Sequence, residues 1–279
     1  MIRKLNSAMM FLCLLGFCVS ACNFGNINNL NAQEAQEAAA EPGKLYELRI
    51  YVTNPGKLED LHNRFRNHTC KLFEKHGMEN IIYWDVVEGD KTDGERAKNM
   101  LVYFIAHKDE AARDASWKAF IADPEWQAAA KKSEENGRIL AEAPIAILMR
   151  DVEFSPTDEE VNHDSDADPR LFELRHYNDG PARVPFTVDR FGSGEVEIFQ
   201  EAGMQTLKFW RTTDDKSFIY LLAHKDREAS KQSWATFMKN FRGFMEKYNQ
   251  SGKTPPADAP AGSGMEIRFL KPTDYSPRK

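Results

Sequence analysis

The chain is poor in cysteine and lacks the short motifs that usually mark metal centres, phosphate sites and serine nucleophiles. Its four cysteines form no Cys-x-x-Cys motif, and its histidines form no His-x-x-x-His motif. Common zinc-ligand spacings are therefore missing. Glycine-rich phosphate loops are absent, and Gly192-Ser193-Gly194 lacks the remaining residues of a nucleophile elbow. The net charge of −6 argues against a nucleic-acid binder, which needs a basic surface. We therefore expect no metal, no cofactor and no nucleic-acid partner.

The N-terminal segment has the features of an export signal. Arg3 and Lys4 precede an apolar run over residues 8–19 that is too short to span a bilayer as a permanent helix. The run ends in Val19-Ser20-Ala21-Cys22, which resembles the lipobox of bacterial lipoproteins. That resemblance implies cleavage before Cys22 and acylation of Cys22. The alternative is an ordinary signal peptide cut at a small residue, which would leave Cys22 free.

Lipidation predicts an exported bacterial lipoprotein, held in a membrane by its N-terminal lipid and facing the periplasm or the cell exterior. Residues 1–21 are the predicted signal peptide. Residues 22–44, rich in Asn, Gln, Ala and Glu, are predicted to be a flexible tether. With two cysteines removed in the signal and Cys22 acylated, Cys70 has no disulfide partner. We expect Cys70 to be a buried, inert thiol on a helix.

Beyond the tether, the sequence repeats itself. Residues 45–51, LYELRIY, return as residues 171–177, LFELRHY. Other matches are Phe73-x-x-x-Gly77-Met78 with Phe199-x-x-x-Gly203-Met204, Trp84 with Trp210, Ala106-His107-Lys108-Asp109 with Ala223-His224-Lys225-Asp226, Trp117 with Trp234, Phe120 with Phe237, and Phe154-Ser155-Pro156 with Tyr275-Ser276-Pro277. A duplication of this length indicates one structural unit used twice.

Hydrophobic periodicity and turn residues predict the order βαββαβ in each copy. The expected strands are residues 45–52, 81–87, 100–106 and 145–152, then 171–177, 206–211, 218–223 and 265–270. The expected helices are residues 58–75, 109–136, 188–202 and 226–248, with Asp109 suited to capping the second of these.

Such a unit forms an antiparallel sheet with two helices on one face, the ferredoxin-like arrangement, and leaves its other face bare. Two units in one chain can cover both bare faces. We therefore predict an α+β fold, with two ferredoxin-like units packed sheet-to-sheet as an intramolecular pseudo-dimeric α/β barrel. The predicted domains are residues 45–156 and 171–277, joined by an acidic, solvated linker over residues 157–170.

These pieces together resemble the NIPSNAP family. They are Glu-Leu-Arg-x-Tyr on a first strand, a helix ending in Gly-Met before a Trp-bearing strand, Trp117-x-x-Phe120-x-x-Asp123-Pro124-Glu125-Trp126 on the second helix, and a last strand running into aromatic-Ser-Pro. The resemblance implies the dimeric α/β-barrel superfamily, which also holds cofactor-free monooxygenases and haem-handling enzymes. The second copy departs from the pattern, with Asn240-Phe241-Arg242-Gly243 in place of the Asp-Pro-Glu-Trp segment. Any site built on that segment would survive only in the first copy.

Polar residues recur on the first strand of each copy. Glu47, Arg49 and Tyr51 share one face, and the second copy repeats them as Glu173, Arg175 and Tyr177. One interpretation places this stripe inside the barrel, facing a ligand. The other, which we favour, is a cross-strand ion pair where the two sheets meet, since buried charges need partners.

The remaining candidates are aromatic residues and histidines. Trp84 and Trp210 are core residues by position, but they could also wall an apolar pocket between sheet and helices. His107 and His224 end the third strands, where a structural hydrogen bond to the next helix is the favoured interpretation.

Two functions fit this sequence. The favoured one is a non-catalytic module that binds a small apolar molecule or a protein partner. The alternative is a cofactor-independent oxygenase or related small-molecule-modifying enzyme, with His68, Tyr51 and Arg49 as polar groups of a pocket in the first domain. An enzyme should show an enclosed pocket with convergent polar side chains, whereas a module should show a filled core. The oligomeric state is left open, and a monomer is allowed.

Overall fold

The computed structural model describes residues 43–162, 170–255 and 264–279. The predicted signal peptide, Cys22 and nearly all of the tether lie outside the described residues. Within the described ranges, none of the helices has the length and apolar character needed to cross a bilayer.

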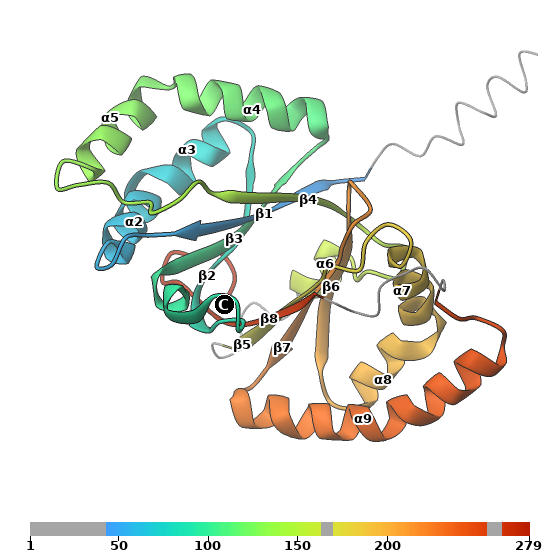
Figure 1. Ribbon diagram of the computed structural model, residues 1–279. Helices are drawn as coiled ribbons and strands as arrows, with labels where there is room; N and C mark the ends of the chain where they lie inside the picture. The colour runs from blue at the N-terminus through green and yellow to red at the C-terminus, as the bar shows by residue number, and fades with distance from the viewer. Residues whose placement is uncertain (1–42, 163–169, 256–263) are drawn as a thin grey trace, which may run out of the picture. The chain divides into compact units, whose positions relative to one another are not determined.

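Eight antiparallel strands form one closed barrel (Figure 1). The first half supplies β1 (Leu45–Val52), β2 (Glu79–Glu88), β3 (Met100–His107) and β4 (Ile145–Asp151), and the second half supplies β5 (Leu171–Tyr177), β6 (Gln205–Thr212), β7 (Phe218–His224) and β8 (Met265–Pro272). Around the barrel the order is β1-β3-β2-β8-β5-β7-β6-β4. Each half therefore keeps the ferredoxin-like strand order, and the predicted intramolecular barrel is confirmed.

The barrel interior is a packed apolar core. Alternation along the strands points Tyr46, Leu48 and Ile50 inward, to a cluster built from all eight strands. At its centre, the rings of Trp84 and Phe104 lie 5.4 Å apart, and those of Phe104 and Trp210 lie 4.8 Å apart. Side chains fill most of the interior, as in other small closed barrels.

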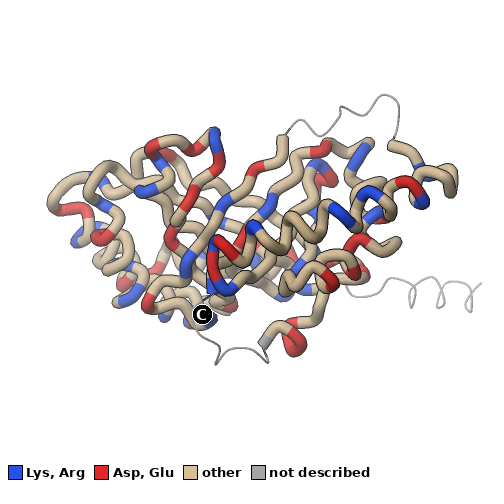
Figure 2. The backbone as a smooth tube through the Cα atoms, turned by 90° about the horizontal axis from the view of Figure 1, so that it is seen from below, with Lys and Arg blue, Asp and Glu red and all other residues tan. Residues whose placement is uncertain are grey.

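Helices cover the outside of each four-stranded sheet (Figure 1). Those of the first half are α2 (Leu58–Arg64), the π-helix η1 (Phe65–Thr69), α3 (Cys70–Lys75), α4 (Glu110–Ala122) and α5 (Pro124–Ser133), and those of the second half are α7 (Val184–Arg190), the π-helix η3 (Phe191–Glu195), α8 (Val196–Glu201) and α9 (Arg227–Gln250). In the second half, Gly194 inside η3 has a non-helical φ of 128°, so the first helix is kinked there. Charged residues of both signs are interspersed along the chain (Figure 2).

The second helix differs between the copies. In the first half, the expected helix over residues 109–136 ends at Ala122 and restarts at Pro124, because proline has no N–H to continue the hydrogen-bond ladder. Asp123 caps the new helix by accepting a hydrogen bond from the Glu125 N–H at 2.8 Å. In the second half, Phe241 stands in place of the proline, and α9 continues unbroken.

The halves join at two strand edges, where β2 pairs with β8 and β4 pairs with β6. The repeated aromatic-Ser-Pro motif strengthens these junctions. After β4, the Ser155 hydroxyl accepts a hydrogen bond from the Phe209 N–H of the second half at 3.0 Å. After β8, Ser276 accepts one from the Tyr83 N–H of the first half, also at 3.0 Å. Each half therefore docks its last segment onto the other.

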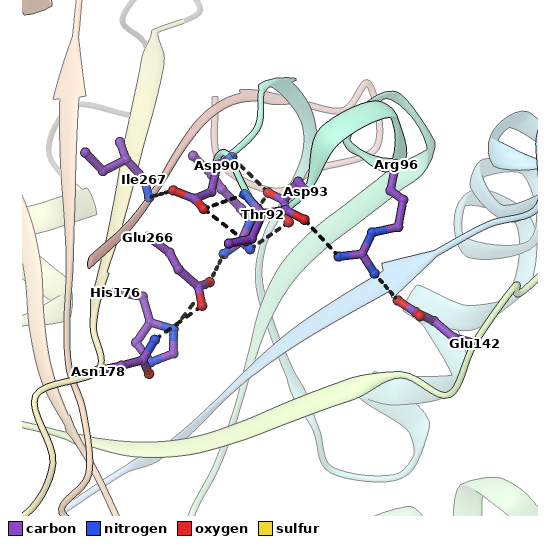
Figure 3. Close-up of polar contacts among 10 residues, drawn as sticks. Asp90, Thr92, Asp93, Arg96, Glu142, His176, Asn178, Glu266 and Ile267 are labelled. Atoms are coloured by element: carbon purple, nitrogen blue, oxygen red, sulfur yellow. Dashed lines mark hydrogen bonds and ion pairs between the residues drawn. The ribbon is translucent and has the colours of Figure 1, made fainter. Parts of the chain in front are cut away.

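One end of the barrel is closed by a polar network between the loop after β2 and strand β8 (Figure 3). Arg268 donates to both carboxylate oxygens of Asp93 at 2.7 and 2.9 Å, and to Glu266 at 2.8 Å. The Ile267 N–H donates to Asp90 at 3.2 Å. The 3₁₀-helix η2 (Gly94–Asn99) follows Asp93. Because Asp93 and Arg268 belong to different halves and are both buried, this ion pair fixes one half against the other.

At the opposite end, the acidic stretch expected to be a solvated linker contains a short helix, α6 (Asp158–Asn162). Asp158 accepts a hydrogen bond from the Tyr46 hydroxyl at 2.8 Å, and Val161 packs against the barrel core. The first part of this stretch is therefore attached to the barrel.

Candidate functional site

Each half buries a glutamate between its sheet and its second helix. Glu47 accepts hydrogen bonds from Arg49 at 2.7 Å, Arg113 at 3.0 Å and Trp117 at 3.0 Å, and His107 Nε2 lies 3.2 Å away. The Glu–Arg–Tyr stripe therefore faces the helices. Both predicted locations, inside the barrel and where two sheets meet, are wrong. The expected cross-strand ion pair is also wrong, because Arg49 pairs with Glu47 two residues away on the same strand.

The second half repeats this arrangement around Glu173. Its carboxylate accepts hydrogen bonds from Arg175 at 2.6 Å, Trp234 at 2.9 Å and Ser230 at 3.2 Å, and it lies 2.8 Å from His224. Burial by itself would raise the pKa of Glu173. The bond to His224, the charge of Arg175 and the bond from Trp234 outweigh burial and lower it to about 2. Glu173 is thus a charged anchor for Arg175.

Next to this anchor, the second half has an open pocket between β5, α7–η3 and α9. The pocket has a volume of about 310 Å³, and its lining residues are Arg175, Tyr177, Asp179, Arg183, Phe186, Thr187, Arg190, Glu195, Trp234, Phe237, Met238, Phe241 and Met265. Five of its thirteen lining residues are aromatic, and five are charged, namely three arginines and two acids. We call it the second-half pocket.

Arg175 forms one side of the second-half pocket. Its guanidinium stacks over the Trp234 ring at 3.6 Å, and its side chain is 12% exposed. Stacking and the Glu173 bond hold the guanidinium in one orientation.

Two further arginines are paired with acids across the second-half pocket. Arg183 lies 3.9 Å from Asp179, which also accepts a hydrogen bond from Thr187 at 2.6 Å. Arg190 lies 3.2 Å from Glu195. Arg183 and Arg190 keep part of their side chains exposed, whereas the two acids are almost fully buried. The arginines are therefore the groups most accessible to a ligand.

Glu195 follows a kink in the first helix of the second half, where Gly194 has a φ of 128°. Burial raises its pKa to about 7, and the opposing charges of Arg190 and Arg175 do not cancel that effect. Glu195 can therefore gain or lose a proton near neutral pH. When it is neutral, the lining is more cationic.

In the first half, Trp126 lies at the corresponding position. Because Pro124 redirects the chain, the Trp126 ring packs 4.4 Å from Phe120, and the Arg64 guanidinium lies 5.4 Å over it. In the second half Phe241 takes this place, with its ring 5.0 Å from Phe237 and the Arg190 guanidinium 5.6 Å over it. There this arrangement lines the second-half pocket, whereas the sequence had suggested a site in the first half.

The structure separates several of the candidates proposed from the sequence. Trp84 and Trp210 point into the barrel core, so they do not wall a pocket between sheet and helices. Arg49 donates to the Tyr51 hydroxyl at 3.2 Å, but His68 is exposed on η1. Across the described residues, no group of three or more His, Cys, Asp and Glu side chains could hold a metal ion.

Sequence reasoning missed Asp179, Arg183, Arg190 and Glu195. Charged residues on a helix usually face solvent, so their type gave no signal.

Comparison with known proteins agrees with this architecture. Residues 46–156 match the NIPSNAP family. This NIPSNAP match covers the first half of the barrel, where the resemblance is confirmed. No curated protein matches the chain.

Several solved structures are similar at low identity. A NIPSNAP-like domain protein from Burkholderia xenovorans is 19% identical, with a TM-score of 0.32, over 42% of this chain and 91% of its own. A nipsnap family protein from Agrobacterium tumefaciens is 20% identical, with a TM-score of 0.35, over 42% and 96%. A protein from Fusobacterium nucleatum, provisionally named a monooxygenase, is 11% identical, with a TM-score of 0.48, over 84% and 94%. The fold assignment comes from the closed strand order itself.

Proposed function

We propose that the protein is a membrane-anchored binding module that holds a small organic anion in its second-half pocket. The observation that carries this proposal is the set of three arginines among aromatic walls in a space of about 310 Å³. Ligand pockets are commonly about 300–1,000 Å³, mostly apolar, with a few placed polar groups. The space therefore suits a compact molecule with an aromatic body and one carboxylate.

Arginine suits this role because its planar guanidinium can donate two parallel hydrogen bonds to a carboxylate. Arg175 is held in place by Glu173 and Trp234 before any ligand arrives. Preorganisation of this kind lowers the entropy cost of binding. Phe186 and Phe241 would then pack against the aromatic body.

A fluorescence titration with 2-naphthoate tests the binding site. We expect Arg190→Met to weaken binding at least tenfold, because it removes a charged partner of the carboxylate. Arg64→Met, the same change at the equivalent position of the first half, should leave binding unchanged. No binding to the wild-type protein at millimolar 2-naphthoate, or equal weakening by both variants, would show that the site is wrongly assigned.

The membrane anchor is the second part of the proposal, and it is supported by the lipobox-like sequence ending in Cys22. Acylation would hold the barrel at the periplasmic or outer face of a membrane through residues 22–44, because each buried methylene contributes about 0.8 kcal/mol. Mass spectrometry of the mature N-terminus should find acylated Cys22. An unmodified first residue other than Cys22 would end this part of the proposal.

A second candidate is a cofactor-independent oxygenase, and Glu195 favours it. A carboxyl with a pKa of about 7 can act as a general base near neutral pH. Glu195 would take a proton from a bound phenol-like substrate, and Arg190 would stabilise the resulting anion. Dioxygen would then oxidise that anion, with one oxygen atom kept in a quinone product and the other released as water. Oxygen consumption that disappears in Glu195→Gln would support this candidate, and none in the wild-type protein with any substituted phenol tried would oppose it.

A further inference from the structure

A second cavity lies inside the barrel, at the end covered by α6, and we call it the barrel mouth. It has a volume of about 30 Å³, enough for a few water molecules. Its lining residues are Tyr46, Ile81, Ile82, Phe104, Asp158, Val161, Arg170, Phe172, Leu207, Lys208, Trp210, Leu221, Arg278 and Lys279. Among these lining residues four are cationic, and Asp158 is the single acid.

Lys208 is the unusual residue of the barrel mouth. It points into the barrel from β6, at the position that Ile82 occupies in the first half, and it is only 3% exposed. An ammonium group is costly to bury unless it is paired. Lys208 lies 2.9 Å from Asp151 and 3.0 Å from Asp158. The buried ammonium group of Lys208 therefore depends on its ion pairs with Asp151 and Asp158 at this end of the barrel.

One of these acids does not belong to the barrel wall. Asp158 comes from α6, and its carboxylate accepts hydrogen bonds from Lys44 at 2.6 Å and Tyr46 at 2.8 Å, in addition to its contact with Lys208. Three donors, on β1, on β6 and just before β1, thus converge on one carboxylate. The barrel mouth is a formed carboxylate receptor, and the segment between the two halves supplies the carboxylate.

The helix that carries Asp158 has little stability of its own. α6 is five residues long, and isolated helices of that length do not persist in water. Its attachment to the barrel mouth comes from Asp158 and from Val161, which packs against the barrel core. If α6 left, the lining would keep its four cationic residues and lose its acid.

We propose that the barrel mouth is a binding site for a small aliphatic carboxylate, and that α6 occupies it as an internal competitor. Asp158 and Val161 present a carboxylate and a branched apolar group, which is the chemistry of a short branched-chain fatty acid. Such a ligand would place its carboxylate on Lys44, Tyr46 and Lys208 and its alkyl group beside Trp210. Inorganic phosphate would satisfy only the cationic part. This site is separate from the second-half pocket.

Titration with 4-methylpentanoate, followed by the indole N–H signal of Trp210 in proton NMR, tests the proposal. We expect weak binding to the wild-type protein, because α6 competes for the same donors. Asp158→Asn should bind at least tenfold more tightly, since the competing charge is gone. Lys208→Met added to Asp158→Asn should remove that gain. Glu159→Gln, an exposed acid on the same helix, should behave as the wild type.

Uncharged 4-methylpentan-1-ol and inorganic phosphate are the ligand controls, and neither should gain affinity in Asp158→Asn. Equal affinity of wild type and Asp158→Asn for 4-methylpentanoate, or an equal gain for the alcohol, would overturn the proposal. If Asp158→Asn does not fold, Val161→Ala replaces it, because loss of the apolar contact should also release α6 and raise affinity. Arg190→Met should leave this binding unchanged, which separates the result from the fate of the second-half pocket.

Discussion

Replacing Glu173 by glutamine should destabilise the protein in a way that depends on pH. The pKa of Glu173 is lowered from 4.5 to about 2 in the folded protein. One pKa unit corresponds to about 1.4 kcal/mol, so the charged carboxylate contributes about 3 kcal/mol to the free energy of unfolding at pH 7. For a barrel of this size, that loss lowers the Tm by roughly 6–12 °C.

The pH dependence gives this prediction its sharpest form. Because the folded pKa lies below the unfolded one, the unfolded chain takes up the proton first on acidification. The contribution of Glu173 is therefore complete above pH 4.5 and is lost as the pH falls towards about 2. Glutamine does not ionise in this range. The difference in stability between the wild type and Glu173→Gln should therefore shrink between pH 4.5 and pH 3.

Urea unfolding followed by tryptophan fluorescence at pH 7, 5, 4 and 3 would measure this difference. Glu135→Gln is a suitable control, because Glu135 is exposed and pairs with Lys132 at 2.8 Å on the surface. That pair should contribute less than about 1 kcal/mol. The reasoning would be refuted if Glu173→Gln cost no more than Glu135→Gln, or if its cost stayed constant from pH 7 to pH 3.

Three further changes have predictable outcomes. Arg268→Met should cost about 3–5 kcal/mol in urea unfolding, because it leaves the carboxylate of Asp93 buried without its partner. Adding Asp93→Asn should recover part of that loss, and a purely additive double variant would contradict the pairing. Burial raises the pKa of Cys70 to about 11. A disulfide reagent at pH 8 should therefore react with Cys70 about 100-fold more slowly in the folded protein than in the urea-unfolded chain. Equal rates in the two states would contradict the burial of this thiol. Binding of 2-naphthoate should weaken as the pH rises from 6 to 8, because ionised Glu195 competes for Arg190. Glu195→Gln should abolish that pH dependence. If this variant kept the wild-type pH profile, Glu195 would not be involved.

The sequence was sufficient for the fold because its information was local and present twice. Strand alternation, turn residues and the repeated Glu-Leu-Arg-x-Tyr segment defined each unit, and the bare sheet faces required closure within the chain. The break at Pro124 follows from proline chemistry, but the expected helix over residues 109–136 had been drawn through it.

The location of the Glu–Arg–Tyr stripe could not be derived in the same way. Alternation shows that Glu47 and Arg49 share a face, but it does not show which face that is. On an ordinary sheet the polar face is the exposed one. In this barrel both faces of β1 are buried, one against the interior and the other against helices, so polarity carried no information about direction. The direction is shown only by the hydrogen bond from Trp117 on α4 to Glu47, which places this face of β1 against the helices.

The second-half pocket was missed for a different reason. Its aromatic wall depends on the position of Phe241, whose ring packs on Phe237 and lies under Arg190. The residue is visible in the sequence, but its position depends on how α9 packs against η3. Such tertiary packing has no local signature.

The anchor is duplicated, whereas the second-half pocket belongs to one copy, so stability and binding can be tested separately within one chain. Glu47 and Glu173 hold equivalent arginines under equivalent tryptophans, so glutamine at either position should lower stability by similar amounts. Arg175 lines the second-half pocket, whereas Arg49 lies in the other half of the barrel. Glu173→Gln should therefore also weaken 2-naphthoate binding, and Glu47→Gln should not. If both variants weakened binding equally, Glu173 would act only through the stability of the barrel. The second-half pocket would then not be the binding site.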